Sequence, residues 1–569
     1  MAMSERVLGI DLGTTYSACG VWEDGHARLI ENAYGDTLTP SVVGVDGDGT
    51  LLVGKPAKER LVSHPESTVA FFKRAMGTEH EIDLGKRRRF TSVELSAMVL
   101  RSLKEDAERA LGQEIKHAVV SVPAYFNEAQ RQATRDAGQI AGLSVNRLIN
   151  EPTAAAIAHG LAVGAEQRFI VLDLGGGTFD VSILEFFDGV LEVHASAGDS
   201  ALGGEDFNAA ILKHFLEAHD IDPADLAPTE QQVLYARVET AKRKMRRDRS
   251  PEIELRRGDT EYRTTLDDEF IKAAAAPLLV RLRAPIERAL SDAATAPSDI
   301  DEVILVGGST RLAVFRSLVT SLFRKIPRAD TDPDLTVARG AVLQAGLAAR
   351  DEALEDVVLT DVCPFSLGVG VQSPDWPRVR ELMFSPILER NCTVPASRLE
   401  QFWTVEDNQD KIDLGVYQGE SRWVSKNLFL GSLTVPVPKA PAGQESVSVR
   451  FSYDVNGLLE VDVKADTTGV QRSKTIENRA GSLSQLEKDK SAKRLAGLKV
   501  LPWERAEIRA LTARADRIYG SLLGARREYL GQAMSRFQAI LERQDPKQIE
   551  RESKAFSELL DSLDVDIWS

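Results

Sequence analysis

Hydrophobic and polar residues alternate with two different periods along this chain. Over residues 1 to about 350, short runs rich in β-branched residues are separated by longer stretches with a helical period. The short runs predict strands at residues 6–10, 118–122, 168–172 and 302–306. The longer stretches predict helices at residues 92–111, 128–141 and 267–290. Strands that alternate with helices in this way are typical of an α/β architecture.

From residue 361 to about 480 the period becomes two. Segments such as residues 446–453 and 459–463 alternate apolar with polar residues, and turn residues separate them. Asn456-Gly457 is a favourable hairpin turn between these two segments. We therefore expect an antiparallel β-domain here, arranged as a sandwich.

The last part of the chain is predicted to be helical and charged. It begins after Ser484, which pairs with Glu487 in a pattern typical of a capping box. Pro502 and the Asp545-Pro546 step divide this part into separate helices, because proline interrupts the helical hydrogen-bond pattern.

A short segment between the first two regions, EDVVLTD at residues 355–361, has an unusual composition. Acidic residues flank Val357, Val358 and Leu359, whereas flexible linkers are normally rich in Gly and Ser. Two interpretations stay open. The segment is either a β-strand of a neighbouring domain or a segment that docks and undocks.

Composition restricts the class of protein. The chain has 569 residues, which corresponds to roughly four folding units at ~150 residues each. Its 43% hydrophobic and 27% charged residues exclude a mostly disordered or collagenous chain. The three cysteines, Cys19, Cys363 and Cys392, lie far apart in the sequence with no CxxC pair. Neither a disulfide scaffold nor a zinc ribbon is therefore expected.

The charge excludes some partners. A formal net charge of −16 repels phosphate backbones, so general nucleic-acid binding is not expected, although a local basic groove for a small anion is compatible with it. Glu5, Arg6 and Asp11 interrupt any apolar core of a signal peptide. No run approaches the ~18 apolar residues that span a bilayer. We expect a cytoplasmic protein with no membrane contact.

An internal repeat is the most informative motif. VLGIDLGTT at residues 7–15 is echoed by IVLDLGGGTFD at residues 170–180. Each copy predicts a strand that ends in a carboxylate, Asp11 or Asp173, followed by a glycine turn with hydroxyls and a second apolar strand. Glycines let backbone N–H groups approach phosphate oxygens, and carboxylates are suitable ligands for Mg²⁺. Two such hairpins facing each other would hold the β- and γ-phosphates of a nucleoside triphosphate with its metal.

Two further glycine patterns are weaker. GTLLVGK at residues 49–55 fits the start of a Walker loop, but Pro56 stands where the metal-binding Ser or Thr belongs. We interpret it as a β-turn region with an exposed Lys55. VILVGGSTR at residues 303–311 predicts a strand that ends in Gly-Gly before a helix, where a ribose or a flat ring can approach closely and Arg311 is available to stack on a base.

Together, the three glycine motifs resemble the phosphate-1, phosphate-2 and adenosine motifs of the actin, sugar kinase and heat-shock ATPase fold. They are most similar to those of the DnaK-type seventy-kilodalton heat-shock chaperones. The matching segments are IDLGTT at residues 10–15, VPAYF at 122–126, QRQAT at 130–134, NEPTAA at 150–155, DLGGGTFD at 173–180, LGGEDF at 202–207, GGSTR at 307–311, DVCPFSLG at 361–368, EDNQ at 406–409 and QGE at 418–420. The resemblance covers about residues 5–480.

The resemblance implies a two-lobed, actin-like ATPase domain with duplicated ribonuclease H-like lobes, which binds ATP or ADP with Mg²⁺. Asp11, Asp173 and Asp180 would hold the metal, largely through water. Lys73 would lie beside the γ-phosphate and help to hold the attacking water, and Glu151 would pair with the metal and its water shell. The catalytic residues it implies are Lys73, Glu151, Asp173 and Thr178. The nucleotide-binding residues it implies are Asp11, Gly13, Thr14, Thr15, Tyr16, Gly175, Gly176, Gly177, Gly203, Gly204, Glu239, Lys242, Arg243, Gly307, Gly308, Ser309, Arg311 and Asp334.

Other positions match the family's elements for communication between sites. The allosteric residues implied are Pro123, Arg131, Val357, Val358 and Leu359. The first two would relay the nucleotide state between the lobes. The last three would form the family's acidic-apolar-acidic docking strand, in which Thr360 replaces a more apolar residue.

The β-domain would bind peptide. Seven residues fall at or beside positions that line the family's peptide groove, namely Leu367, Val369, Phe402, Trp403, Val405, Ile412 and Leu414. An extended segment would bind there through main-chain hydrogen bonds, with an apolar pocket for a Leu- or Ile-like side chain. Core packing of the sandwich is the alternative for about half of them. Trp403 replaces a small residue and the loop at residues 372–386 is longer than usual, which indicates an altered or narrowed range of clients.

Departures from the family pattern suggest a subtype. We expect an ATPase domain at residues 1–355, a linker at 356–361, a β-sandwich substrate-binding domain at 362–483 and a truncated helical lid at 484–569. The segment between Gly77 and Ala118 is short, and Arg246 stands where a small hydroxyl residue is usual, which weakens a nucleoside contact. These features resemble the small, specialised bacterial HscC-like members.

The sequence thus predicts an ATP-hydrolysing chaperone that couples ATP binding and hydrolysis to release and capture of extended apolar segments. Its expected partners are unfolded polypeptides, a J-domain co-chaperone and a nucleotide exchange factor, and it is expected to be a monomer. Two alternatives are an ATP-binding regulator or exchange factor of another chaperone and a small-molecule kinase on the same fold. The kinase alternative leaves the β-domain unexplained.

Overall fold

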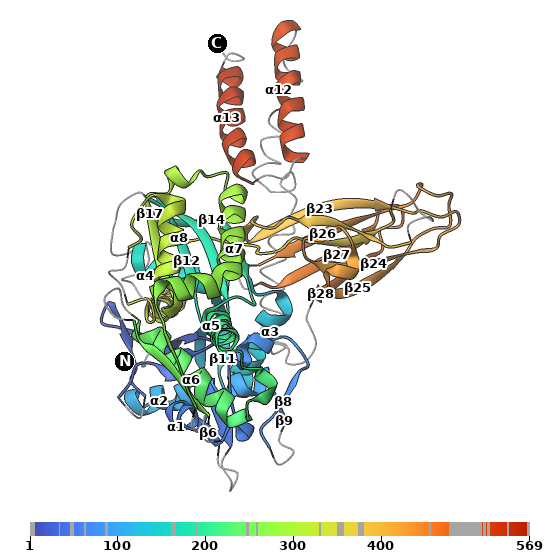
Figure 1. Ribbon diagram of the computed structural model, residues 1–569. Helices are drawn as coiled ribbons and strands as arrows, with labels where there is room; N and C mark the ends of the chain where they lie inside the picture. Colours follow the sequence, from blue (N-terminus) through green and yellow to red (C-terminus); the bar gives the residue numbers. More distant parts are fainter. Residues whose placement is uncertain are drawn as a thin grey trace.

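The computed structural model describes most of the chain. The described residues are 6–32, 35–45, 51–61, 64–85, 89–160, 167–187, 190–245, 250–257, 260–328, 332–349, 358–373, 380–454, 457–476, 515, 519, 524–542 and 546–565. Figure 1 shows two α/β lobes, a β-sandwich that projects to one side of them, and a pair of C-terminal helices apart from the sandwich. Among the described residues, no helix is both long enough and apolar enough to cross a membrane.

The first lobe is built on a mixed sheet with the strand order β11-β10-β1-β2-β3, and β4 also pairs with β2. Its strands are β1 (Val7–Leu12), β2 (Tyr16–Glu23), β3 (His26–Leu29), β4 (Thr39–Pro40), β10 (His117–Val122) and β11 (Ser144–Asn150). β1 runs parallel to β10 and antiparallel to β2. The strands predicted at residues 6–10 and 118–122 are observed with boundaries shifted by one or two residues.

Helices α2 (Ser92–Leu111) and α3 (Glu128–Ile140) belong to this lobe and agree with the helices predicted at residues 92–111 and 128–141. Helix α2 begins at a capping box, in which the Thr91 hydroxyl accepts the Glu94 N–H and the Glu94 carboxylate accepts the Thr91 N–H. Such a box satisfies two donors that the first helical turn would otherwise leave unpaired.

The second lobe repeats this plan with the strand order β17-β12-β13-β14-β18. Its strands are β12 (Gln167–Leu174), β13 (Phe179–Phe187), β14 (Val190–Asp199), β17 (Glu302–Val306) and β18 (Val358–Leu359). Its helices are α5 (Gly204–Ala218), α6 (Pro228–Lys244), α7 (Asp268–Asp292) and α8 (Ala313–Phe323). The predicted helix at residues 267–290 is α7, and Asp267 caps it by accepting the Phe270 N–H.

Two helices, α4 (Glu151–Gly160) and α9 (Thr336–Ala348), pack together and share a buried cluster with strands of both lobes. Gly340 lies so close to Ala154 that a Cβ at residue 340 would collide with the backbone of α4. The absence of a side chain at Gly340 therefore lets the two helices pack closely within the cluster that both lobes share.

Smaller elements complete the lobes. The strands are β5 (Val42–Val45), β6 (Leu51–Val53), β7 (Thr68–Ala70), β8 (Glu81–Asp83), β9 (Arg89–Thr91), β15 (Glu252–Arg257) and β16 (Thr260–Thr265). The short helices are α1 (Lys55–Glu59), η1 (Pro65–Ser67), η2 (Phe72–Ala75), η3 (Pro223–Asp225), η4 (Pro297–Asp299) and η5 (Gly308–Arg311). Residues 49–50 lie outside the described residues, and residues 51–55 are the strand β6, Gly54 and the start of α1, so the interpretation of this part as a β-turn region was wrong. Lys55 is half-exposed there and forms an ion pair with Asp36 at 3.3 Å.

The sandwich consists of two four-stranded antiparallel sheets around one core, together with a short pair of strands at its base. The first sheet, in the order β21-β20-β24-β25, contains β20 (Leu367–Val371), β21 (Met383–Leu388), β24 (Lys411–Gln418) and β25 (Leu428–Pro436). The second, in the order β23-β26-β27-β28, contains β23 (Ala396–Trp403), β26 (Ser446–Tyr453), β27 (Leu459–Ala465) and β28 (Gln471–Ile476). The pair at the base is β19 (Asp361–Val362) and β22 (Thr393–Val394), and η7 (Val424–Lys426) precedes β25. β26 pairs with β27 as predicted, although Asn456 lies outside the described residues.

The C-terminal helices α12 (Gly524–Glu542) and α13 (Pro546–Val565) lie side by side (Figure 1) and share a small apolar core. The rings of Phe537 and Phe556 stack in it with their centroids 4.5 Å apart. The break predicted at Asp545-Pro546 falls between the two helices. Ser484, Glu487 and Pro502 lie outside the described residues.

Candidate functional site

A cavity of about 1500 Å³ lies between the two lobes. Nineteen residues that the family resemblance implied line it, namely Asp11, Gly13, Thr14, Thr15, Tyr16, Glu151, Asp173, Gly175, Gly176, Thr178, Gly204, Glu239, Lys242, Arg243, Gly307, Gly308, Ser309, Arg311 and Asp334. Four others, Lys73, Gly177, Asp180 and Gly203, do not line it directly. Residues from both halves of the chain therefore meet at one site.

The two glycine hairpins face each other across this cavity. The turn after β12 approaches the turn after β1 so closely that a Cβ at Gly176 would collide with the Thr15 hydroxyl. The sequence predicted two opposed hairpins, and the structure brings them together. Glycine is needed at Gly176 because a larger residue would push the two turns apart and block backbone N–H groups from a bound anion.

Lys73 does not line the cavity itself but contacts Glu151, which does. It lies in η2, after Phe71, whose φ of 59° turns the chain sharply. Its Nζ donates to Glu151 Oε1 at 2.8 Å, and both side chains are buried. Glu151 is the first residue of α4 and lines the cavity, so the pair places a cation and an anion at the junction of the lobes.

Three aspartates gather beside this pair. Burial, reinforced by the charge of Glu151, raises the pKa of Asp11 to about 7 and the pKa of Asp180 to about 7. Burial also raises the pKa of Asp173 well above its usual value, and the charges of Glu151, Asp180 and Asp11 add to the effect. Carboxyl groups that raise one another's pKa values form a site with an excess of negative charge.

This cluster fits a divalent cation. The Ser121 hydroxyl donates to Asp11 and the Tyr125 N–H donates to Asp180 Oδ1, whereas Asp180 Oδ2 is buried with no hydrogen-bond partner. An unpartnered buried carboxylate oxygen is costly unless a cation or an ordered water occupies its neighbourhood. Within the described ranges, no group of three His, Cys, Asp or Glu residues is close enough to bind a metal directly. Mg²⁺, which commonly keeps several waters, is compatible with this spacing.

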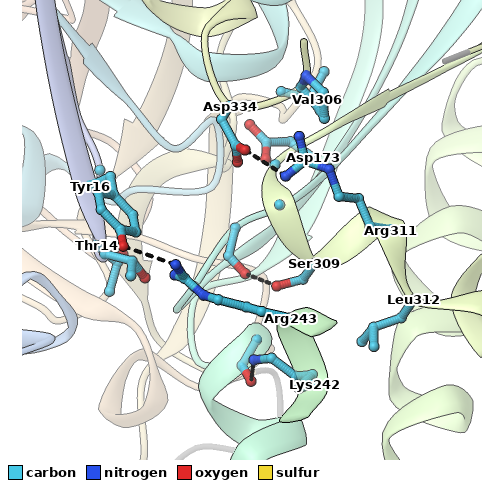
Figure 2. Close-up of a pocket in the computed structure, with 18 of the residues that line it drawn as sticks. Thr14, Tyr16, Asp173, Lys242, Arg243, Val306, Ser309, Arg311, Leu312 and Asp334 are labelled. Carbon is cyan, nitrogen blue, oxygen red and sulfur yellow. Dashed lines mark hydrogen bonds and ion pairs between the residues drawn. The ribbon is translucent and has the colours of Figure 1, made fainter. Parts of the chain in front are cut away.

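The opposite end of the cavity carries a network of charges from helix α6. Glu239 pairs with Lys242 at 2.8 Å and with Arg243 at 2.5 Å. Burial opposes ionisation of Glu239, but these two cations lower its pKa to about 2. Arg243 Nη1 also donates to the Tyr16 hydroxyl at 2.9 Å, as Figure 2 shows, so α6 of the second lobe contacts β2 of the first.

The third glycine motif closes the cavity from the side of β17. Gly307 has a φ of 82°, a conformation that favours glycine, and it lies against the carbonyl of Leu174. The Ser309 hydroxyl donates to the Gly175 carbonyl at 3.1 Å. Arg311 Nη1 donates to Asp334 at 2.5 Å (Figure 2), so Arg311 is held at the edge of the cavity by an ion pair.

The cavity extends beyond the predicted residues. Arg316, Ser317, Thr320 and Ser321 of α8 also line it. Their i, i+4 spacing places them on one face of a helix that follows the Gly307 turn, which is a signal that the sequence contained. Glu205 was missed too, and burial raises its pKa to about 7. Arg246, where the sequence departs from the family, lies outside the described residues.

Arg131, one of the two predicted relay residues, takes part in contacts that join the first lobe to the end of the linker. Arg131 donates to the carbonyls of Ala124 and Phe126, both at 3.0 Å, and so fixes the turn that begins at Pro123. Arg131 Nη2 also donates to Asn150 Oδ1 at 2.7 Å, and Asn150 Nδ2 donates to Asp361 Oδ2 at 2.8 Å. A chain of hydrogen bonds therefore runs from α3 to the first residue of β19.

The linker segment forms a strand of the second lobe. Val358 and Leu359 pair in parallel with Val190 and Leu191 of β14, and the Thr360 N–H donates to the Leu191 carbonyl at 3.1 Å. Val357 lies outside the described residues. The structure agrees with the first interpretation, because the segment is a strand of a neighbouring sheet. A segment that docks and undocks would show the same pairing in its docked state, so the second interpretation stays open.

The sandwich contacts the lobes directly. Arg390 pairs with Asp292 of α7 at 2.8 Å, and Asn391 Oδ1 accepts the Ser196 N–H at 3.0 Å. The Glu128 N–H donates to Gln418 Oε1 at 3.0 Å, which joins α3 to β24. We call this arrangement, with β18 paired and the sandwich in contact with the lobes, the docked arrangement.

The seven predicted groove residues divide into two groups. Leu367, Val369, Ile412 and Leu414 are buried in the core of the sandwich, as the packing alternative expected for about half of them. Phe402 is partly buried against that core, whereas Trp403 and Val405 are 54% and 50% exposed. The structure thus places three of the seven residues at or near the surface and four inside. Residues 374–379 of the long loop lie outside the described residues.

Comparisons with known proteins agree with this geometry. A family model described as "Hsp70 protein" matches residues 7–84 and 81–561. "Chaperone protein DnaK" from Thermotoga neapolitana is 42% identical over 493 residues, which cover 84% of this chain and 81% of that protein. The protein of the same name from Thermosipho africanus is 40% identical over 490 residues, with coverages of 84% and 80%.

The site combines two facing glycine hairpins, a buried Lys–Glu pair and a cluster of aspartates. These features define the class of the protein as an ATPase built from duplicated lobes. The family match extends from the first lobe through the sandwich into the C-terminal helices. The chain belongs to the Hsp70 family and is an ATP-hydrolysing chaperone. The predicted family and function are thereby confirmed, and the kinase and regulator alternatives are not favoured. The HscC-like subtype stays a prediction.

Proposed function

We propose that the cavity binds Mg²⁺ with ATP or ADP, and that the nucleotide controls how the sandwich holds extended apolar segments of unfolded polypeptides. The observation that supports this proposal is the docked arrangement. One strand of the second lobe's sheet, β18, leads after a single residue into β19 at the base of the sandwich. A change in the cleft that alters the edge of this sheet would therefore also act on the sandwich.

In the cleft, the residues of this chain would bind, orient and stabilise charge. The turns at Thr14–Thr15 and Gly175–Thr178 would donate backbone and hydroxyl hydrogens to the phosphate oxygens. Lys73, oriented by Glu151, would neutralise the charge that develops on the transferred phosphoryl group and help to hold the attacking water. Mg²⁺, when bound near Asp11, Asp173 and Asp180, would withdraw charge from the phosphate oxygens. Glu239, Lys242, Arg243 and Arg311 would hold the nucleoside end.

In the sandwich, Trp403 and Val405 would contact the bound segment. They are exposed apolar side chains, Trp403 at the end of β23 and Val405 two residues after it. A segment bound there would pair with the sandwich through its main chain and cover these two side chains. A J-domain co-chaperone and a nucleotide exchange factor are the proposed partners. The monomeric state and the cytoplasmic location predicted from the sequence stay predictions.

A single-turnover ATPase assay with and without an apolar peptide and a J-domain protein tests this proposal. Wild type should hydrolyse ATP faster with both additions. Trp403→Ala should weaken peptide binding, measured by fluorescence anisotropy, and leave the rate without peptide unchanged. Tyr529→Ala is the matched control, because Tyr529 is a similarly exposed aromatic residue of α12. Absence of ATP hydrolysis in wild type, or an equal loss of peptide affinity in both variants, would contradict the proposal.

A further inference from the structure

Two of the three cysteines lie together at the base of the sandwich, although they are far apart in the sequence. β19 pairs with β22 so that Asp361 lies opposite Val394 and Val362 opposite Thr393. Continuing this register by one residue places Cys363 opposite Cys392. The spacing of the cysteines along the chain did not predict this pairing, because it does not show which strands pair.

The backbone geometry suits a disulfide. The Cys363 N–H donates to the Cys392 carbonyl at 2.9 Å, and the Cys363 carbonyl accepts the Asn391 N–H at 2.7 Å. Two residues on one strand therefore bond to one residue on the other, as in a β-bulge, and Asn391 has the positive φ of 61° that such an irregularity requires. Of the two residues that face Cys363, Cys392 is the one that continues the register of Val362 with Thr393. Residues paired in such a register have Cα atoms ~4.5–5.5 Å apart, which lies within the ~4.4–6.8 Å range of disulfides.

The two thiols differ in environment. Cys363 is buried, whereas Cys392 is partly exposed, so an oxidant in solution would reach Cys392 first. The interaction between the two thiols raises the pKa of Cys363 and lowers the pKa of Cys392, and Cys363 Sγ donates to the Phe365 carbonyl at 3.0 Å. A thiolate reacts faster than a thiol, so Cys392 would be the nucleophile and Cys363 the second thiol that completes the bond.

Each cysteine is next to a contact with the lobes. On one side, Asp361 accepts from Asn150 at 2.8 Å, two residues before Cys363. On the other side, Asn391 directly precedes Cys392, and its Oδ1 accepts the Ser196 N–H at 3.0 Å. A covalent bond between the cysteines would therefore join two segments of the sandwich that hold it against the lobes.

We propose that Cys363 and Cys392 form a reversible disulfide under oxidation by a hydroperoxide, and that this bond stabilises the docked arrangement. The Cys392 thiolate attacks the O–O bond of hydrogen peroxide, which gives a sulfenic acid and releases hydroxide. Cys363 then attacks the sulfenic sulfur, the S–O bond breaks, and the thiol proton leaves with the oxygen as water. Two thiols lose two electrons and two protons, and one peroxide becomes two waters. A dithiol such as dithiothreitol reverses the reaction.

The formation of the bond can be tested on the full chain without nucleotide or peptide, so the result is independent of the proposed function. Hydrogen peroxide should remove two of the three free thiols together, decrease the mass by two hydrogen atoms and cross-link the proteolytic peptides that contain Cys363 and Cys392. Dithiothreitol should restore both thiols. Cys19 is an internal control that should stay reduced, because burial raises the pKa of its thiol to about 12.

Single variants test the order of reaction. Cys363→Ser should leave a sulfenic acid on Cys392 that dimedone traps, whereas Cys392→Ser should leave Cys363 reduced. If wild type also accumulates the dimedone adduct without a cross-linked peptide, or if the cross-link joins two chains, the disulfide proposal is wrong.

The effect on docking is measured by hydrogen exchange of the Thr360 amide, which donates to the Leu191 carbonyl in the docked arrangement. This amide should exchange more slowly in the oxidised chain than in the reduced chain. The Cys363→Ser, Cys392→Ser double variant is the control, and peroxide should not change its exchange. Equal exchange in oxidised and reduced wild type would show that the bond does not stabilise docking and would overturn that part of the proposal.

Discussion

The two lobes have the same arrangement of central strands, and the differences between them show which lobe supplies each part of the site. In both, a central strand has an aspartate as its last residue but one, pairs in parallel with one neighbour and antiparallel with the next, and leads into a glycine turn. In the first copy Asp11 lies opposite Ala18, whereas in the second Asp173 lies opposite Asp180. The second lobe therefore brings two carboxyl groups to the place in the hairpin where the first lobe has one.

The outer strands of the two sheets differ as well. In the first lobe, β3 has only four residues, and among the described strands none pairs with its outer edge. In the second lobe, β14 has ten residues, and its edge pairs with β18. A longer edge strand offers unpaired backbone groups to a further strand, and in the second lobe β14 uses them to pair with β18. The first lobe contacts the sandwich through side chains instead, from Asn150 to Asp361 and from the Glu128 N–H to Gln418.

The largest expected effect is at the residue of the first lobe that has no counterpart in the second. Lys73→Ala should slow single-turnover ATP hydrolysis by roughly 10²- to 10³-fold, because the charge that stabilises the transferred group is removed. Lys55→Ala is the matched control, since Lys55 is a half-exposed lysine of the same lobe outside the cavity. An equal loss in both variants, or none in Lys73→Ala, would remove Lys73 from the catalytic site.

The second prediction tests the extra carboxylate of the second lobe. Asp180→Asn should reduce the effect of Mg²⁺ on nucleotide affinity by roughly 10- to 100-fold. A loss of this size is typical for a residue that supports a metal without binding it directly. Calorimetric titration of ADP at several Mg²⁺ concentrations measures it. Ser182→Ala on the same strand is the control, because the Ser182 hydroxyl bonds to Ser196 away from the cavity. If both variants bind Mg²⁺-ADP as tightly as wild type does, the additional carboxylate of the second lobe has no role in metal binding.

The third prediction concerns the edge of the second sheet. Thr360→Pro removes the N–H that donates to the Leu191 carbonyl and should weaken docking by about 1 kcal/mol. Thr360→Val keeps that N–H and removes a buried hydroxyl oxygen that has no hydrogen-bond partner, so it should strengthen docking. Stimulation of the ATPase by peptide, compared between the two variants, checks both directions. Changes of the same sign in both would show that this backbone bond does not decide docking.

The smallest expected effect is on the pH dependence of docking. Burial raises the pKa of Glu128, while Arg135, Arg131 and the Tyr453 hydroxyl oppose the shift and Asp454 adds to it. A carboxyl whose pKa is raised on docking binds its proton more tightly in the docked arrangement, so docking should weaken as the pH rises through this raised pKa.

Glu128→Gln should therefore flatten the pH dependence of the Thr360 amide exchange. Glu114→Gln is the control, because Glu114 is an exposed carboxylate of the same lobe. Docking that strengthens with rising pH in wild type, or an unchanged pH profile in Glu128→Gln, would show that the Glu128 carboxyl does not control it.

Much of the fold could be predicted from local patterns. Helix α2 was predicted at its observed bounds from its helical period alone, and the structure adds a capping box at Thr91 and Glu94 that agrees with it. The predicted strand boundaries differ from the observed ones by up to two residues. Residues 51–55 were misinterpreted because a glycine-lysine pattern is similar in a turn and at the start of a helix, and only the contacts of α1 with its neighbours distinguish them.

The sequence by itself determined the duplicated hairpins, most of the residues of the cleft and the family, because these depend on residue types at short and regular spacings. Only the tertiary structure decided which groove residues are buried, that β18 joins β14, and that Cys363 lies opposite Cys392. These facts depend on which distant strands pair and in which register. Such pairing is set by the packing of whole sheets, and residue spacing along the chain does not record it.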